Sequence, residues 1–163
     1  MIVSGSSDGI GEALAHKLAK MGFNICMINR NSLKMDKVAK SLQATNVQVL
    51  QIVCDLSTMS TVEQYKDILV QIYKLDVSMV FLNAGVLTIG RFLSLKDCEI
   101  EAMVKVNLLH PILLAKAILP QLLNRKQRSA IVFTSSIAST VAMPGLACYA
   151  AAKAAISRFA ESL

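Results

Sequence analysis

The chain has 163 residues, of which 54% are apolar and 17% are charged, and its formal net charge is +6. This length fits one domain with a sizeable core, and this composition excludes a disordered chain. The basic residues gather on an expected helix face (34–40) and in an expected loop (125–128), without an aromatic-rich basic strand. We therefore expect no nucleic-acid partner.

The sequence also bears on membranes and compartment. The stretch 129–152 has no charged residue and could span a bilayer by length, but it is dense in hydroxyl groups and Pro144-Gly145 would break a helix there. We expect no membrane span in this chain, and the N-terminus lacks the pattern of a signal peptide. The four cysteines lie far apart with no C-x-x-C pair, so we expect free thiols in a reducing compartment and not a secreted protein.

Apolar runs of strand length alternate with helical periodicity along the chain. The expected strands are 1–4, 23–28, 47–53, 77–82 and 130–134. The expected helices are 9–21 (with Ile10, Ala13, Leu14 and Leu18 on one face), 33–42, 58–75, 97–123 interrupted at Pro111, and one that begins near 146. Near-continuous Val/Ile/Leu strands joined by helices predict a parallel sheet covered on both faces. The sequence thus predicts an α/β fold with a doubly wound sheet, in a single domain over 1–163.

The first strand-to-helix turn reads Gly5-Ser-Ser-Asp-Gly9-Ile-Gly11. In a doubly wound sheet this turn is where the phosphates of a dinucleotide bind. Gly5 would allow a tight turn, Gly9 a close approach of backbone to pyrophosphate, and Gly11 close packing of the helix on the sheet. Taken alone, such spacing marks only a turn. Because it follows an expected strand and opens an expected helix, it predicts a dinucleotide site.

The stretch CYAAAK, from Cys148 to Lys153, places a phenol and an ammonium four residues apart. Residues at this spacing share a helix face. A tyrosine of ordinary pKa, about 10, exchanges protons poorly at neutral pH. A unit charge about 4 Å away contributes on the order of 4 kcal/mol at an effective dielectric of about 20, before desolvation opposes it. The pair suits general acid–base catalysis; an ordinary exposed helix pair is the alternative.

Five stretches together resemble the short-chain dehydrogenase/reductase family, in the same order and spacing. They are the turn from Gly5 to Gly11, Asn83-Ala84-Gly85, Asn107 in the long helix, Ser136, and Tyr149-x-x-x-Lys153. The resemblance covers the whole chain and implies a Rossmann fold. Taken singly, each stretch has a structural alternative: Asn107 could be a polar residue beside a kink at Pro111, and Ser136 one of many loop serines.

The resemblance implies a mechanism. Tyr149 would donate a proton to the forming alkoxide while a reduced nicotinamide delivers hydride to a substrate carbonyl, and Ser136 would hold the carbonyl oxygen. Lys153 would also hold the nicotinamide ribose, and Asn107 would position a water that relays protons from Lys153 to solvent.

The cofactor is predicted to be NADP(H), with NAD as the second choice. Enzymes that use NAD commonly place an acid at the end of the second strand, but here the residues are Asn29-Arg30. The Arg30 guanidinium could bind a 2′-phosphate bidentately; a solvated loop cation is the alternative. The full set of expected cofactor-binding residues is Gly5, Ser7, Gly9, Ile10, Gly11, Arg30, Asp55, Asn83, Ala84, Gly85, Tyr149 and Lys153, with Asp55 implied by the resemblance to contact the adenine. No metal site is expected, since His16 and His110 have no ligand-spaced partners.

Three departures from the family pattern stand out. Ser4 replaces a usual threonine, and Leu82 replaces a frequent asparagine. The family runs to about 250 residues in one domain, whereas this chain stops within the helix that bears Lys153. We therefore expect a C-terminally incomplete domain that lacks the sixth and seventh strands, either a fragment or a truncated paralogue.

The residues SDGIG and Asn29-Arg30 resemble the branch with hydroxysteroid dehydrogenases and 3-oxoacyl-CoA reductases. This implies a small carbonyl or alcohol substrate of steroid, acyl-CoA or similar lipid-like type, and a cytoplasmic or endoplasmic reticulum-associated protein. We expect a homo-oligomer of the complete protein through the long helix and the Tyr149 helix. The alternative is a non-catalytic structural or regulatory subunit that kept the fold.

Overall fold

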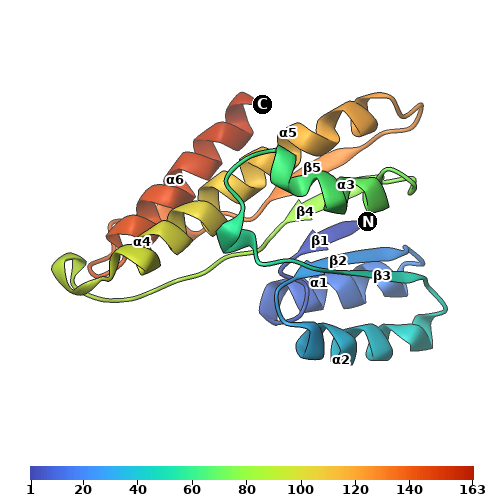
Figure 1. Ribbon diagram of the computed structural model, residues 1–163, viewed down its shortest axis with the longest axis horizontal. Helices are drawn as coiled ribbons and strands as arrows, with labels where there is room; N and C mark the ends of the chain where they lie inside the picture. Colours follow the sequence, from blue (N-terminus) through green and yellow to red (C-terminus); the bar gives the residue numbers. More distant parts are fainter.

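The computed structural model describes all residues, 1–163, and contains a five-stranded parallel sheet in the order β3-β2-β1-β4-β5. The strands are β1 (Ile2–Ser4), β2 (Ile25–Asn29), β3 (Val49–Val53), β4 (Met79–Leu82) and β5 (Ala130–Phe133). The helices are α1 (Gly9–Lys20), α2 (Ser32–Leu42), α3 (Lys66–Ile72), α4 (Asp97–Val104), α5 (His110–Leu123) and α6 (Ala147–Ser162). From the central β1–β4 pair, the chain adds β2 and β3 on one side and β5 on the other, which confirms the doubly wound sheet (Figure 1).

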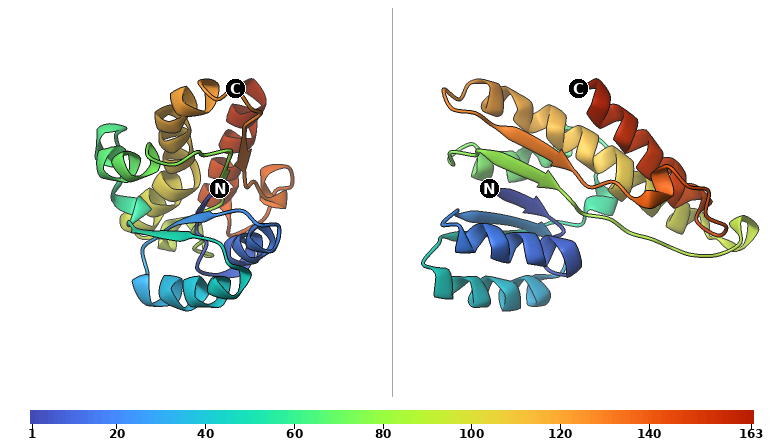
Figure 2. Two further views of the ribbon diagram at one scale, coloured as in Figure 1. Left: turned by 90° about the vertical axis from the view of Figure 1, so that its right-hand side faces the viewer. Right: turned by 180° about the vertical axis from the view of Figure 1, so that it is seen from behind.

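Each face of the sheet has its own apolar core. Helices α1 and α2 cover one face, and α3, α5 and α6 lie on the other (Figures 1 and 2). Along β1, Ile2 packs into the core beneath α3 and α5, while Val3 packs into the core beneath α1 and α2. Because successive side chains of a strand point to opposite faces, a strand buried on both faces is apolar throughout.

Three expectations about helices are wrong, and the first two concern the segment 58–75 and α1. The segment 58–75 is not one helix, since two 3-10 turns, Leu56–Thr58 and Glu63–Tyr65, precede α3. Its early backbone N–H groups bond to side chains instead, and Gln64 Oε1 accepts from the amides of residues 60 and 61. Such local bonds compete with helix formation. Ile10 is not a core residue of α1, because it is 66% exposed at the open end of the sheet.

The helical run 97–123 is continuous where an interruption at Pro111 was expected. A π-helical turn, Lys105–Leu109, joins α4 to α5, and Pro111 lies in the first turn of α5. Proline fits a first helical turn because it has no N–H to donate. The run is long and apolar enough to cross a membrane, a property that core helices share, and half of its apolar window is buried inside the fold.

Candidate functional site

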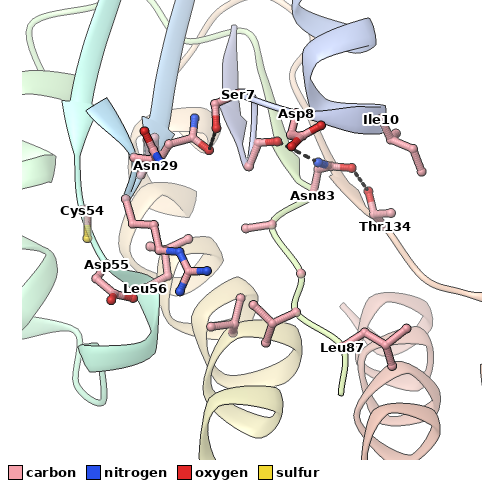
Figure 3. Close-up of a pocket in the computed structure, with 18 of the residues that line it drawn as sticks. Ser7, Asp8, Ile10, Asn29, Cys54, Asp55, Leu56, Asn83, Leu87 and Thr134 are labelled. Carbon is pink, nitrogen blue, oxygen red and sulfur yellow. Dashed lines mark hydrogen bonds between the residues drawn. The ribbon is translucent and has the colours of Figure 1, made fainter. Parts of the chain in front are cut away.

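A cavity of about 720 Å³ opens at the carboxyl ends of the strands, above the β1–β4 pair. This position and volume are typical of ligand sites in doubly wound sheets. Figure 3 shows it between the glycine-rich turn (Ser7, Asp8, Ile10) and the segment Cys54–Leu56, with Leu87 at the far end. Of the expected site residues, the cavity is lined by Gly5, Ser7, Ile10, Arg30, Asp55, Asn83, Ala84, Gly85, Ser136, Tyr149 and Lys153. Gly9, Gly11 and Asn107 lie outside its lining.

The glycine-rich turn depends on close backbone contacts. Gly5 has φ +71°, and a Cβ there would lie 2.8 Å from Cα of Ala84. A Cβ on Gly11 would overlap the Gly5 carbonyl. Gly9 has φ +53° but faces open space. Two glycines are therefore required by packing within the chain, while the third leaves backbone accessible in front of α1.

Asn29 holds this turn against the end of β2, a role that the sequence analysis missed. Its Nδ2 donates to Ser6 Oγ at 2.8 Å, and its Oδ1 accepts from Ser7 Oγ at 3.2 Å (Figure 3). Asn29 is only 7% exposed. A polar residue at the end of an otherwise apolar buried strand was the available signal, because such a side chain needs partners.

Arg30 and Asp55 line the same end of the cavity. The exposed Arg30 guanidinium makes no hydrogen bond or ion pair within the chain. Asp55 Oδ1 accepts from Ser57 Oγ at 2.7 Å and from Ser57 N at 3.0 Å. These bonds, and then the nearby charge of Arg30, hold the pKa of Asp55 below its usual value. Arg30 is thus a cation free to bind a ligand anion.

A chain of hydrogen bonds connects the glycine-rich turn to Lys153. Asn83 Nδ2 donates to the carbonyls of Ser4 (3.3 Å) and Gly5 (3.5 Å), and its Oδ1 accepts from Thr134 Oγ1 at 3.2 Å. The Thr134 carbonyl in turn accepts from Lys153 Nζ at 2.7 Å. The fully buried Ser4 hydroxyl accepts from the amides of Asn83 and its neighbour at 3.1 Å each, so serine performs this bridging here.

Lys153 and Tyr149 occupy one face of α6, as the spacing predicted. The ammonium lies 5.8 Å from the centroid of the Tyr149 ring. Lys153 is 4% exposed, and burial lowers its pKa. The Tyr149 hydroxyl has no hydrogen-bond partner within the chain and lines the cavity with Ser136, whose Oγ accepts from Ala138 N at 3.2 Å. Phenol, hydroxyl and ammonium therefore reach one cavity from α6 and the loop after β5.

Asn107 lies in the π-helical turn, where its side chain is fully engaged. Oδ1 accepts from Val86 N at 3.1 Å, and Nδ2 donates to the Val86 carbonyl at 2.7 Å. These bonds fix the loop that follows Asn83-Ala84-Gly85. The buried amide is thus not free to bind a ligand. In a regular α-helix the N–H of residue 111 would bond to the Asn107 carbonyl, and Pro111 has no such group.

The parallel doubly wound sheet, the glycine-rich turn and the cavity at the strand ends are typical of nucleotide-binding α/β proteins. The short chain dehydrogenase family model matches residues 1–163. The chain belongs to this family.

Curated relatives are longer than this chain. It is 30% identical over 163 residues to an uncharacterized oxidoreductase of Listeria innocua, covering 100% of the chain and 65% of the relative. It is 35% identical to inactive hydroxysteroid dehydrogenase-like protein 1 of Homo sapiens and 30% identical to very-long-chain 3-oxoacyl-CoA reductase of Podospora anserina, covering 99% of the chain and 49% and 48% of those relatives. The chain thus spans about half to two thirds of their length.

Solved structures share the fold. A metagenomic short-chain oxidoreductase in complex with NADP has a TM-score of 0.88 at 28% identity, covering 99% of this chain and 72% of that one. The alcohol dehydrogenase of the archaeon Thermococcus sibiricus, complexed with 5-hydroxy-NADP, has a TM-score of 0.84 at 30% identity, with coverages of 99% and 68%.

Proposed function

We propose that the protein is an NADP(H)-dependent oxidoreductase that transfers hydride between the nicotinamide and a carbonyl or secondary alcohol. The observation that carries this proposal is the joint presence of Tyr149, Lys153 and Ser136 in the cavity that the glycine-rich turn also lines. The cavity volume and the unpaired Arg30 cation fit a dinucleotide that bears an additional phosphate. When bound, NADPH would supply the hydride.

Three side chains would handle the proton and the substrate oxygen. The Ser136 hydroxyl would donate to the carbonyl oxygen, and Tyr149 would deliver the proton. The Lys153 ammonium, held by the Thr134 carbonyl, places a positive charge 5.8 Å from the centroid of the Tyr149 ring. The unpartnered Tyr149 hydroxyl leaves room for a substrate oxygen as its partner.

Asn107 would contribute through its backbone. Its side chain is occupied by Val86, but Pro111 deprives its carbonyl of the usual helical donor. A carbonyl in a π-helical turn can then accept from a water, and such turns are frequent at functional sites. We infer that this carbonyl, rather than the side-chain amide, holds the water of a proton relay from Lys153.

The coenzyme preference would rest on Arg30, which has no internal partner and meets no acid at the end of β2. A guanidinium binds phosphate bidentately. Two solved relatives were obtained with NADP or a derivative of it. Asp55, on the other side of Arg30, would contact the adenine.

The substrate would be apolar. Exposed Leu87 lines the cavity, and further exposed apolar side chains lie on the loop after β4 (Ile89) and on the loop after β5 (Ile137, Val141, Met143). These loops meet where Gly90 N donates to the Gly145 carbonyl at 3.1 Å, at the far end of the molecule in Figures 1 and 2. An apolar rim suits a steroid or acyl chain, and one relative is named a very-long-chain 3-oxoacyl-CoA reductase.

The second candidate is a non-catalytic structural or regulatory protein, because a 35% identical relative is named inactive. The two functions are separated by mixing the protein with NADPH and a panel of steroid ketones and 3-oxoacyl-CoA esters and following absorbance at the nicotinamide wavelength. Turnover supports the oxidoreductase; coenzyme binding without turnover of any ketone supports the second candidate. We also propose self-association through α5 and α6, to be measured by sedimentation.

A further inference from the structure

Besides Arg30 and Lys153, the cavity is lined by a third cation, which the proposed function does not use. Lys34, in the first turn of α2, lines it together with Arg30. Lys34 Nζ lies 2.6 Å from Oδ2 of Asp8, the N-cap residue of α1. Lysine and aspartate thus bridge the starts of two helices at the cavity mouth. The sequence analysis counted Lys34 only as part of a solvated helix face.

The first turn of α2 is unusual in its charge. Acidic side chains are favoured at helix N-termini because they oppose the positive end of the helix dipole, but this turn has no acid and contains Lys34. Asn31 caps the helix by accepting from Lys34 N at 2.9 Å. The Lys34 charge, the positive end of the α2 dipole and the charge of the unpaired Arg30 therefore all contribute positive potential at this point. An anion placed here would be favoured by all three.

The Asp8–Lys34 ion pair is suited to exchange. The Lys34 side chain is 55% exposed and that of Asp8 is 73% exposed. Exposed ion pairs contribute little to stability. The Lys34 ammonium has no partner other than Asp8, and the Asp8 carboxylate has one further partner, the Gly9 amide. A ligand anion of higher charge can therefore replace the Asp8 carboxylate as the partner of Lys34.

We propose that Lys34 is a specificity-determining residue for the 2′-phosphate of NADPH, and that Asp8 competes with that phosphate for it. This inference rests on the proposed function. A phosphate monoester carries a charge of about −2 at neutral pH and can displace the carboxylate, whereas the 2′-hydroxyl of NADH cannot. Arg30 provides the bidentate contact, and Lys34 provides a second point charge. Asp8 thereby limits how strongly the site prefers NADPH.

The test measures dissociation constants for NADPH and NADH by coenzyme fluorescence, without turnover. Lys34→Gln should weaken NADPH binding about tenfold or more and change NADH binding by less than about twofold. Asp8→Asn should tighten NADPH binding and leave NADH binding unchanged. Lys37→Gln is the matched control, because Lys37 is exposed on the same helix but does not line the cavity. Circular dichroism verifies that each variant is folded.

Several outcomes overturn the inference. A loss in Lys34→Gln that is equal for both coenzymes, or no larger than in Lys37→Gln, removes Lys34 from the phosphate site. Weaker NADPH binding in Asp8→Asn rules out competition. If the wild-type protein prefers NADPH and Lys34→Gln keeps that preference, this inference alone fails. If the wild-type protein binds neither coenzyme, the proposed function fails first and the inference with it.

Discussion

At the scale of single residues, Tyr149 has the most direct role in the proposed chemistry. Its hydroxyl is free within the chain, lines the cavity and lies on the helix face that carries Lys153. A positioned acid or base contributes about 10²–10⁴-fold to a rate. We expect Tyr149→Phe to lower kcat by about this factor while NADPH affinity, measured by fluorescence, stays close to that of the wild-type protein. Ketone reduction at an undiminished rate would exclude Tyr149 as the acid.

A second prediction at the residue scale concerns the contribution of Ser4 to stability. Its buried hydroxyl satisfies the amides of Asn83 and Ala84. Ser4→Ala would leave these N–H groups without a partner, which costs about 1–3 kcal/mol. Chemical denaturation should show that loss in the free energy of unfolding. Ser60→Ala is the control and should show almost no loss of stability, because Ser60 is exposed and its hydroxyl makes no hydrogen bond.

At the scale of elements, the π-helical turn predicts an effect of Pro111. Pro111→Ala restores an N–H that can bond to the Asn107 carbonyl and compete with a relay water. We expect kcat to fall by about tenfold, less than the roughly 10²–10⁴-fold effect of a positioned acid or base, with coenzyme affinity unchanged. Pro120→Ala is the control, because Pro120 is also inside α5 but lies outside the cavity lining. Equal kcat values for the two variants would contradict the carbonyl role.

Some elements of the fold could be predicted from the sequence, and others could not. The parallel doubly wound sheet, the alternation of strands with helices and the shared face of Tyr149 and Lys153 could be predicted, because they follow from apolar periodicity and helical spacing. The break in 58–75 could not, since it depends on where the Gln64 side chain bonds. The π-helical turn was equally hidden, because a proline inside an apolar helical run is compatible with a break or with a new first turn.

Within the site, residues whose role is a backbone or charge property could be predicted, and those defined by a long-range partner could not. Gly5 belongs to the first kind, and Arg30 could be placed at the cavity, where its role in coenzyme choice stays a prediction. Asn29 and Lys34 belong to the second, since only the fold brings them to Ser6 and Asp8. Asn107 lies outside the lining of the cavity, and its pairing with Val86 directs attention to its carbonyl instead of its amide.

At the scale of the whole molecule, stability should depend on pH through His110. This histidine is fully buried, its Nδ1 pairs with the Tyr65 hydroxyl at 2.9 Å, and its Nε2 has no partner. Burial lowers its pKa from 6.5 to about 3. Between these values the unfolded chain binds a proton that the folded protein does not, so the stabilisation is complete above pH 6.5 and is lost as pH falls toward 3.

The measurable quantity is the slope of unfolding free energy against pH. One proton taken up on unfolding corresponds to about 1.4 kcal/mol per pH unit. We expect His110→Asn to reduce this slope over about two pH units, roughly from pH 6 to pH 4, because this window lies between the unfolded and folded pKa values of His110. The asparagine amide can still form a hydrogen bond with the Tyr65 hydroxyl. His16→Asn is the matched control, because it removes a histidine that is partly exposed. An unaltered slope in His110→Asn would show that other groups cause the acid sensitivity.

The hydrogen bonds that run from Gly5 through Asn83 and Thr134 to Lys153 have a consequence for alignment. The two ends of the cavity come from opposite ends of the chain, and small displacements could accumulate through every intervening strand and helix. Three side-chain links, between the ends of β1 and β4, between the ends of β4 and β5, and from the end of β5 to α6, replace that long route with a short one. The glycine-rich turn and the Lys153 ammonium therefore shift together when the sheet twists, and the spacing between them is preserved.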